Sequence, residues 1–362
     1  MRVVMTVLDS LPARHVDPQC TPALHALAVA GGWRREGGRA VMTSATYPNH
    51  ATFATGTGPD QHGIVANWVP INSSVPRDRA VRPAWELGPA VPTLFDACRA
   101  AGRSSIAVVG DQNLVGVMGA LAADEHWPPD GVVPAGTRTD VIGYIDDRDT
   151  ALVLFAALDR KPDLLVAQIN GADTAAHVHG PDADGAIDAY RSVDAIVGEV
   201  RVRLAPDWDD IVWIIVSDHD QETVTVGEPI DLQTQARTRG LDVWVIPEGN
   251  AALVCGPDLL DGDWLAEVDG LQGSVSSADA VRTTWCVPGG CFGREGDPVP
   301  RGTHGGPRTR AQVAVVAGGH PAVEAIAGAL DRGRVHAADW GTTIADLLAL
   351  ELPTTTGRSL AR

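Results

Sequence analysis

Two apolar runs in this chain each end at an aspartate, and this pattern constrains the fold more than any other feature. Residues 3–8 read Val-Val-Met-Thr-Val-Leu and precede Asp9, while residues 211–216 read Ile-Val-Trp-Ile-Ile-Val and precede Ser217 and Asp218. Short apolar runs rich in β-branched residues are typical of strands that are buried on both faces. Because open α/β sheets place ligands beyond the carboxyl ends of their strands, both aspartates are candidates for a functional site.

Other apolar runs alternate with helix-like segments, and this alternation predicts βαβ units around a mostly parallel central sheet flanked by helices. The expected strands cover residues 2–8, 104–109, 163–169, 211–217 and 312–317. The expected helices cover residues 21–30, 93–101, 149–159, 184–204 and 339–350. Thr21 precedes a proline and is the expected N-cap of the first of these helices.

Residues 220–303 break the alternation. This segment is rich in glycine and proline and holds short strand-like pieces such as residues 243–246. We therefore predict a catalytic domain made of residues 1–219 and 304–362, with residues 220–303 inserted as a small α+β cap. The chain has 362 residues, of which 44% are hydrophobic, and this is enough for a large core.

Six residues of metal-ligand type lie in four short clusters along the chain. They are Asp9, Asp173, His177, Asp218, His219 and His304. Aspartate and histidine suit divalent zinc, and six such ligands are enough for two ions. Asp173 and His177 are four positions apart, so they can share one face of a helical turn. Two metals about 4 Å apart can bind the attacking and leaving oxygens of a phosphoryl transfer.

A candidate nucleophile, Thr46, lies between the first two of these clusters. Pro48 and the residues after it predict the start of a helix that ends at Gly56. Thr46 would then lie at a helix N-terminus, where free N–H groups favour a phosphate anion. A threonine hydroxyl is a weak nucleophile at neutral pH, but coordination to a divalent ion lowers its pKa. We interpret the nearby His50 and His62 as structural residues.

The order of these motifs resembles the alkaline phosphatase superfamily, and within it the nucleotide pyrophosphatase/phosphodiesterase branch. The resemblance runs nearly end to end and rests on residues 7–10, 21–27, 46–56, 62–67, 173–177, 217–219, 302–305, 339–348 and 357–360. It implies an alkaline phosphatase-like α/β fold. It also implies hydrolysis of a phosphodiester or pyrophosphate bond through a phospho-threonine intermediate.

The resemblance also implies a role for each site residue, with two divalent ions as cofactors and zinc as the preferred metal. One ion would be held by Asp173, His177 and His304. The other would be held by Asp9, Asp218 and His219, with the Thr46 oxygen beside it. Asn67 would be a catalytic residue that binds a non-bridging phosphate oxygen, and Tyr47 would stack on a nucleobase or another leaving group.

Three alternatives remain open at this point. A phosphonoacetate-type hydrolase, which breaks a carbon–phosphorus bond, and a phosphomonoesterase would use the same two-metal site. A non-catalytic protein of this fold would bind a phosphate-containing ligand without cleaving it. Residues 42–76 contain no lysine or arginine, which favours a diester over the more concentrated charge of a monoester. Asp220 stands where the family usually has glycine, and its carboxylate would either support a ligand histidine or disturb metal binding.

The charge balance limits the expected partners. The chain has 28 lysines and arginines against 46 aspartates and glutamates, which gives a net charge of -18. Such a surface repels nucleic acid polymers and anionic membranes, so we expect neither as a partner. The resemblance implies a small phosphate-containing substrate instead. We find no leader segment and no apolar run of 18 residues, and we expect a cytoplasmic protein with five free cysteines. The sequence predicts no particular oligomeric state.

Overall fold

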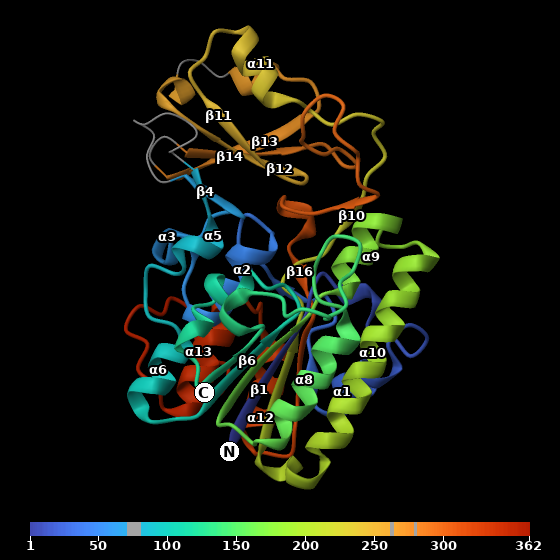
Figure 1. Cartoon of the computed structure of the whole chain (residues 1–362), viewed down its shortest axis with the longest axis vertical. Helices are drawn as coiled ribbons and strands as arrows, with labels where there is room; N and C mark the ends of the chain where they lie inside the picture. The colour runs from blue at the N-terminus through green and yellow to red at the C-terminus, as the bar shows by residue number, and fades with distance from the viewer. Residues whose placement is uncertain (71–80, 261–263, 279–280) are drawn as a thin grey trace.

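The computed structural model describes residues 1–70, 81–260, 264–278 and 281–362, and it shows a large α/β layer structure with a smaller antiparallel sheet above it (Figure 1). The central sheet has seven strands in the order β2-β17-β9-β1-β8-β6-β7. Their bounds are β1 Arg2–Leu8, β2 Gly32–Trp33, β6 Ser105–Val109, β7 Glu125–Trp127, β8 Leu164–Ile169, β9 Ile211–Val216 and β17 Ala314–Ala317. Strands β9, β1, β8, β6 and β7 are parallel, whereas β17 is antiparallel to both of its neighbours. The predicted mostly parallel α/β sheet is therefore confirmed.

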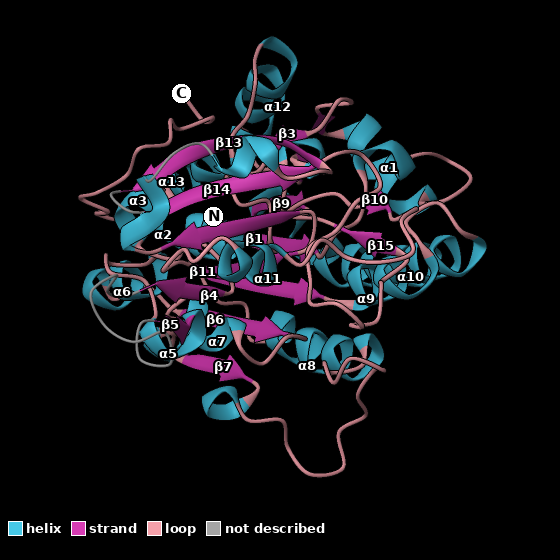
Figure 2. Cartoon of the chain, turned by 90° about the horizontal axis from the view of Figure 1, so that it is seen from above, coloured by secondary structure: helices cyan, strands magenta, loops and turns pink. Residues whose placement is uncertain are grey.

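Helices cover both faces of this sheet, as the view from above shows (Figure 2). One group consists of α1 Pro22–Ala30, α8 Asp147–Asp159, α9 Gly171–His179 and α10 Asp184–Leu204. The other consists of α2 Thr46–Thr55, α6 Leu94–Ala101, α12 Ala322–Arg332 and α13 Ala337–Leu348, with the short helices α3 Pro59–His62, α5 Ala84–Leu87 and α7 Leu114–Val117. Alternate residues of β1 pack into the two resulting cores, with Met5 in one and Val4 in the other. This explains why β1 reads as a continuous apolar run.

Most predicted elements are present, and their boundaries differ for local reasons. The helix expected at 149–159 begins at Asp147, because the Asp146 side chain accepts the Arg148 N–H and caps it. The strand expected at 312–317 is divided into β16 Ala311–Gln312 and β17. Thr21 is the N-cap residue of α1, as predicted, but its side chain does not cap the helix, since its hydroxyl donates to the His15 carbonyl at 2.7 Å. The carboxylate of Asp194 instead accepts the first free N–H groups of α1.

A second sheet forms within residues 220–303, with the order β11-β12-β14-β13 and antiparallel pairing throughout. Its strands are β11 Trp244–Glu248, β12 Ala251–Cys255, β13 Leu271–Ala278 and β14 Val281–Cys286, with α11 Leu232–Thr238 packed on it. The chain enters and leaves this segment through the pair β10 Glu222–Thr223 and β15 Gly302–Thr303. The short pairs β4 Trp68–Pro70 with β5 Val81–Pro83, and β3 Gly38–Arg39 with β16, complete the described strands.

Two remaining observations concern the chain as a whole. Among the helices in the described residues, none is both long and apolar enough to cross a membrane. All five cysteines are buried and free.

Candidate metal and nucleophile site

The fold brings all six predicted metal ligands together at the carboxyl ends of the central strands. Asp9 directly follows β1, Asp218 and His219 follow β9, and α9, which follows β8, carries Asp173 and His177. His304 follows β15 and comes from the stem of the smaller sheet. Three groups have ligand atoms within 4.8 Å of one another, namely Asp173 with His177 and His304, Asp9 with Asp173 and His219, and Asp9 with His50 and Asp218.

Three histidines of this cluster are oriented in the same way, each by its Nδ1 atom. The Nδ1 atom lies 2.9 Å from the Gly302 carbonyl in His177, 3.2 Å from the Ser44 carbonyl in His304 and 3.2 Å from the Asp220 carbonyl in His219. An Nδ1–H that donates to a carbonyl leaves the lone pair on Nε2. The His177 Nε2 lies 3.5 Å from an Asp173 oxygen, and the His219 Nε2 lies 3.2 Å from an Asp218 oxygen. Carbonyl-anchored histidines that face carboxylates are typical of metal ligands.

The carboxylates of Asp9 and Asp218 are fully buried, and each uses only one oxygen in a hydrogen bond. Gln168 donates to Asp9 Oδ2 at 2.7 Å, and the Ser10 N–H donates to Asp218 Oδ1 at 3.0 Å. Asp9 Oδ1 and Asp218 Oδ2 have no hydrogen-bond partner among the described residues. Burial raises the pKa of both carboxyl groups above the ordinary value of 3.8. Because a nearby cation stabilises a buried carboxylate, the free oxygens fit divalent metal ions.

Burial acts on the histidines in the opposite direction. It lowers the pKa of His219 to about 4 and lowers the pKa of His304 well below 6.5. Both rings are therefore neutral at physiological pH, which is the form that binds a metal. The two rings are stacked with their centroids 3.9 Å apart. This donor set of neutral imidazoles and carboxylates suits zinc or a similar ion.

The candidate nucleophile lies beside this cluster. Thr46 is the first residue of α2, and its Oγ1 lies 3.2 Å from the Nε2 of His219. The helix starts two residues before Pro48 and ends at Gly56, whose φ of 66° is the left-handed conformation that glycine adopts readily. The free N–H groups at the start of α2 therefore lie beside the Thr46 hydroxyl, next to the cluster of aspartates and histidines.

The two histidines that we interpreted as structural differ in their surroundings. His62 is buried and accepts the Ile64 N–H on Nδ1 at 3.1 Å, while its Nε2 lies 3.0 Å from the Thr52 hydroxyl. These contacts agree with a structural role. His50 has its Nδ1 2.9 Å from the Thr46 carbonyl and 3.6 Å from an Asp218 oxygen. It therefore lies closer to the metal cluster than the sequence indicated.

The two predicted substrate-binding residues lie in different environments. Asn67 Oδ1 is buried without a hydrogen-bond partner among the described residues. Its loop is bound to the segment before Thr46, because the Thr43 hydroxyl donates to the Val65 carbonyl at 3.0 Å. The Tyr47 side chain is buried, and its hydroxyl accepts a hydrogen bond from Asn113 at 2.8 Å. Its stacking role therefore stays a prediction.

Asp220 is turned away from the ligand histidine. Both of its carboxylate oxygens accept hydrogen bonds from Arg14 at 2.7 Å. It is the backbone carbonyl of Asp220, not the side chain, that faces His219 Nδ1. The Asp220 side chain therefore forms an ion pair with Arg14. The hydrogen-bond acceptor that Asp220 offers to His219 Nδ1 is its main-chain carbonyl.

Sequence reasoning missed the polar residues that hold the carboxylates. Gln168 belongs to β8 and donates to Asp9, while Gln221 donates to Asp173 Oδ1 at 2.7 Å. The signal for Gln168 was a single polar residue in an otherwise apolar strand, where an unpaired amide would be unfavourable. Gln221 lies in an irregular segment, and no local pattern indicates its partner.

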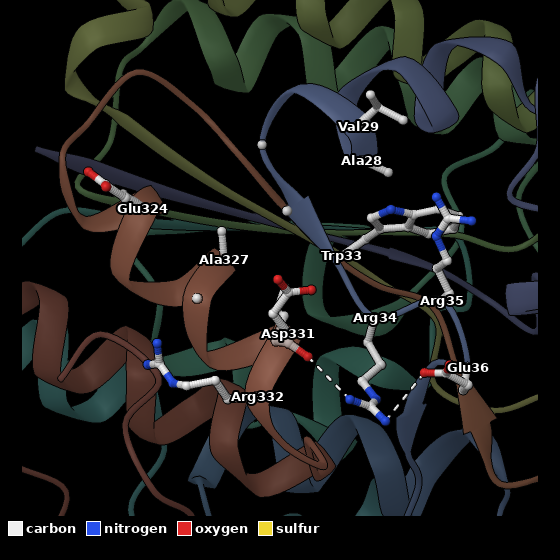
Figure 3. A pocket seen from close by; sticks show the side chains of 14 residues that line it. Ala28, Val29, Trp33, Arg34, Arg35, Glu36, Glu324, Ala327, Asp331 and Arg332 are labelled. Atoms are coloured by element: carbon white, nitrogen blue, oxygen red, sulfur yellow. Dashed lines mark hydrogen bonds and ion pairs between the residues drawn. The ribbon is translucent and has the colours of Figure 1, made fainter.

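A cavity of about 790 Å³ lies elsewhere, between α1, β2 and α12 (Figure 3). Three arginines line it against three acidic residues, namely Arg34, Arg35 and Arg332 against Glu36, Glu324 and Asp331. Arg34 is already bound to the Leu330 carbonyl at 3.4 Å and to Glu36 at 3.3 Å. None of the predicted site residues lines this cavity, so it is separate from the candidate site.

Comparison with known proteins shows the family of this chain. Residues 3–269 match the family described as type I phosphodiesterase / nucleotide pyrophosphatase. Venom phosphodiesterase 2 of Crotalus adamanteus is 25% identical over 202 residues, which are 52% of this chain and 22% of that protein. Ectonucleotide pyrophosphatase/phosphodiesterase family member 3 of Mus musculus is 27% identical over 173 residues, which are 44% of this chain and 18% of that protein. The chain thus spans only about a fifth of the length of these relatives.

Solved structures show the same fold over almost the whole chain. An inactive form of murine ectonucleotide pyrophosphatase / phosphodiesterase 5 in complex with AMP superposes with a TM-score of 0.73 at 17% identity, covering 99% of this chain and 97% of the other. Phosphonoacetate hydrolase from Sinorhizobium meliloti in complex with phosphonoformate gives a TM-score of 0.71 at 17% identity, with 96% of each chain covered.

Proposed function

Because this chain belongs to the type I phosphodiesterase/nucleotide pyrophosphatase family, we propose that it is a metal-dependent hydrolase of phosphodiester or pyrophosphate bonds with Thr46 as its nucleophile. One observation carries the proposal. The Thr46 hydroxyl lies at the N-terminus of α2 and 3.2 Å from a histidine nitrogen of the Asp/His cluster. A hydroxyl, free N–H groups and metal ligands at one point are what phosphoryl transfer to a protein side chain needs.

Two divalent ions, with zinc preferred, would be held by this cluster, in which Asp9 is grouped both with Asp173 and His219 and with His50 and Asp218. Asp173, His177 and His304 would hold one, and Asp9, Asp218 and His219 would hold the other. Bound ions would lower the pKa of the Thr46 hydroxyl and neutralise charge on the phosphoryl oxygens. The buried unpartnered oxygens of Asp9 and Asp218 support this assignment.

The protein residues then account for the two chemical steps. The Thr46 oxygen attacks phosphorus in line, and the bond from phosphorus to the leaving group breaks as the new bond forms. The N–H groups at the start of α2 and the amide of Asn67 donate to the phosphoryl oxygens. Water attacks the phospho-threonine in the second step, which breaks the bond to Thr46 and restores the hydroxyl. The substrate would be a small phosphate ester, since a net charge of -18 disfavours nucleic acid polymers.

A carbon–phosphorus hydrolase is the second candidate, because the fold also superposes on phosphonoacetate hydrolase. The absence of lysine and arginine from residues 42–76 weighs against a small dianionic substrate. The test is a side-by-side assay of bis-p-nitrophenyl phosphate, a nucleotide p-nitrophenyl ester and phosphonoacetate on zinc-loaded protein. Turnover of the diesters that is lost in Thr46→Ala supports the proposal. Fastest turnover of phosphonoacetate would favour the second candidate, and no turnover by the loaded protein would contradict both.

A further inference from the structure

The tip of the β11–β12 hairpin of the smaller sheet carries a buried acidic residue against the loop that holds Asn67. Glu248, the last residue of β11, is only 4% exposed. Its Oε1 accepts the Asn67 N–H at 2.9 Å, and the Trp68 N–H also stabilises its charged form. Burial raises the pKa of Glu248 to about 8. Burying a glutamate side chain costs free energy that its hydrogen bonds only partly offset, so its place against this loop needs an explanation.

The same hairpin tip also binds the loop that carries the metal ligand His304. The Asn250 N–H donates to the His304 carbonyl at 2.8 Å, and Asn250 Oδ1 accepts the Gly306 N–H. Between them, Gly305 has a φ of +115°, and a Cβ at this position would lie 1.9 Å from the Glu248 carbonyl oxygen. The hairpin tip thus lies in close contact with two loops of the candidate site.

Backbone contacts are what orient Asn67. Among the described residues its Oδ1 has no hydrogen-bond partner, so the main chain sets the direction in which this side chain leaves the loop. The main chain is held at the Asn67 carbonyl, which accepts the Ala84 N–H at 3.0 Å, and at the Asn67 N–H by Glu248. Removing Glu248 would free the N–H groups of Asn67 and Trp68 and leave the Asn67 carbonyl as the remaining main-chain contact at Asn67 among the described residues.

We propose that Glu248 is a positioning residue: from the inserted sheet it fixes the backbone at Asn67, so that the Asn67 amide is held ready for the phosphoryl group. This inference rests on the proposed function and deepens it. It makes the hairpin tip of the smaller sheet a part of the reaction site, acting through Asn67. Residues that orient a group in contact with the substrate commonly affect activity by about 10- to 100-fold.

The test is a double-mutant cycle with Glu248→Gln and Asn67→Ala, and Glu228→Gln, an exposed glutamate of the same segment, is the matched control. The glutamine keeps the size of the side chain but has one acceptor oxygen and an NH₂ donor, so it cannot accept from the Asn67 and Trp68 N–H groups through two oxygens as the carboxylate can. We expect Glu248→Gln to lower kcat/KM for a diester about 10- to 100-fold, and the double variant to be no worse than Asn67→Ala alone. The control should match the wild type. Independent, multiplying losses, or a Glu248→Gln variant within about twofold of the wild type, would overturn the inference.

A second readout separates this inference from the proposed function. In calorimetry, the zinc-loaded Glu248→Gln variant should bind inorganic phosphate more weakly than the wild type, and the double variant should bind it no more weakly than Asn67→Ala alone. Amide exchange at residues 64–68 should be faster in Glu248→Gln. If the wild type cleaves no diester while phosphate binding still follows the cycle, the proposed function fails and the positioning role stands. If diesters are cleaved and Glu248→Gln equals the wild type, the positioning role fails. Should Glu248→Gln not fold, Glu248→Asp, which keeps the carboxylate one methylene shorter, enters the same cycle with the same expectation.

Discussion

The hydroxyl of Thr46 lies 3.2 Å from the Nε2 of His219, although 173 positions separate the two residues in the chain. The contact exists because α2 starts where β9 ends. His219 is held from its other ring nitrogen by main-chain and hydroxyl oxygens, with the Ser10 Oγ 3.1 Å from Nδ1. Nε2 is therefore directed at the candidate nucleophile, where the proposed divalent ion would bind.

Substrate charge gives the first prediction. A diester presents one negative charge to the site, and residues 42–76 supply no cation for a monoester dianion. We expect kcat/KM for bis-p-nitrophenyl phosphate to exceed that for p-nitrophenyl phosphate by more than about tenfold, which corresponds to about 1.4 kcal/mol of transition-state discrimination. Both substrates are assayed with the same zinc-loaded preparation. A faster monoester would show that an arginine outside this segment reaches the phosphate.

Metal content gives the second prediction, with two neighbouring aspartates as a matched pair. Elemental analysis of protein purified without chelator should find two divalent ions per chain. Asp218→Asn should lose one of them, because it removes a charged ligand whose second oxygen has no hydrogen-bond partner among the described residues. Asp220→Asn should keep both ions, because that carboxylate binds Arg14. Equal metal content in the two variants would contradict the ligand assignment.

Acid sensitivity gives the third prediction. Burial lowers the pKa of His62 to about 4, below the ordinary value of 6.5. The neutral ring therefore stabilises the fold above pH 6.5, and this contribution is lost as the pH falls towards 4, by up to about 1.4 kcal/mol per pH unit. In His62→Asn the amide oxygen can still accept the Ile64 N–H but does not titrate. The difference in unfolding free energy between wild type and variant should shrink from pH 6.5 to pH 4, measured by urea denaturation. Parallel pH profiles would contradict this role of His62.

Regular patterns made much of the fold predictable. The apolar run before Asp9 and the one before Asp218 become adjacent parallel strands, with Val3 paired to Val212. Strand ends in a parallel sheet meet at one edge, so the ligands that follow them must lie close together. The ligand cluster therefore followed from periodicity, helix spacing and motif order.

Contacts between distant segments were not predictable in the same way. The free N–H groups of the first helix donate to Asp194, about 170 positions away, and not to the side chain of the N-cap residue Thr21. Glu248 lies in a segment that resembles an independent insertion, yet it binds the backbone of Asn67. Such contacts depend on how two elements pack, and no local pattern in one element encodes its partner. Tyr47 shows the same limit, since burial against Trp85 is a property of the packed core.

The central claim is that Thr46 becomes covalently phosphorylated, and mass spectrometry of protein quenched with acid during turnover tests it most directly. We predict one phosphoryl group on the peptide that contains Thr46. Thr46→Ser should also be phosphorylated at this position and keep part of the turnover, since serine offers the same hydroxyl. Thr46→Ala should bind metal but lose the phosphoryl group and nearly all turnover. Near-normal turnover in Thr46→Ala, with no phosphorylated residue in the quenched wild type, would contradict the account and show that water attacks the substrate directly.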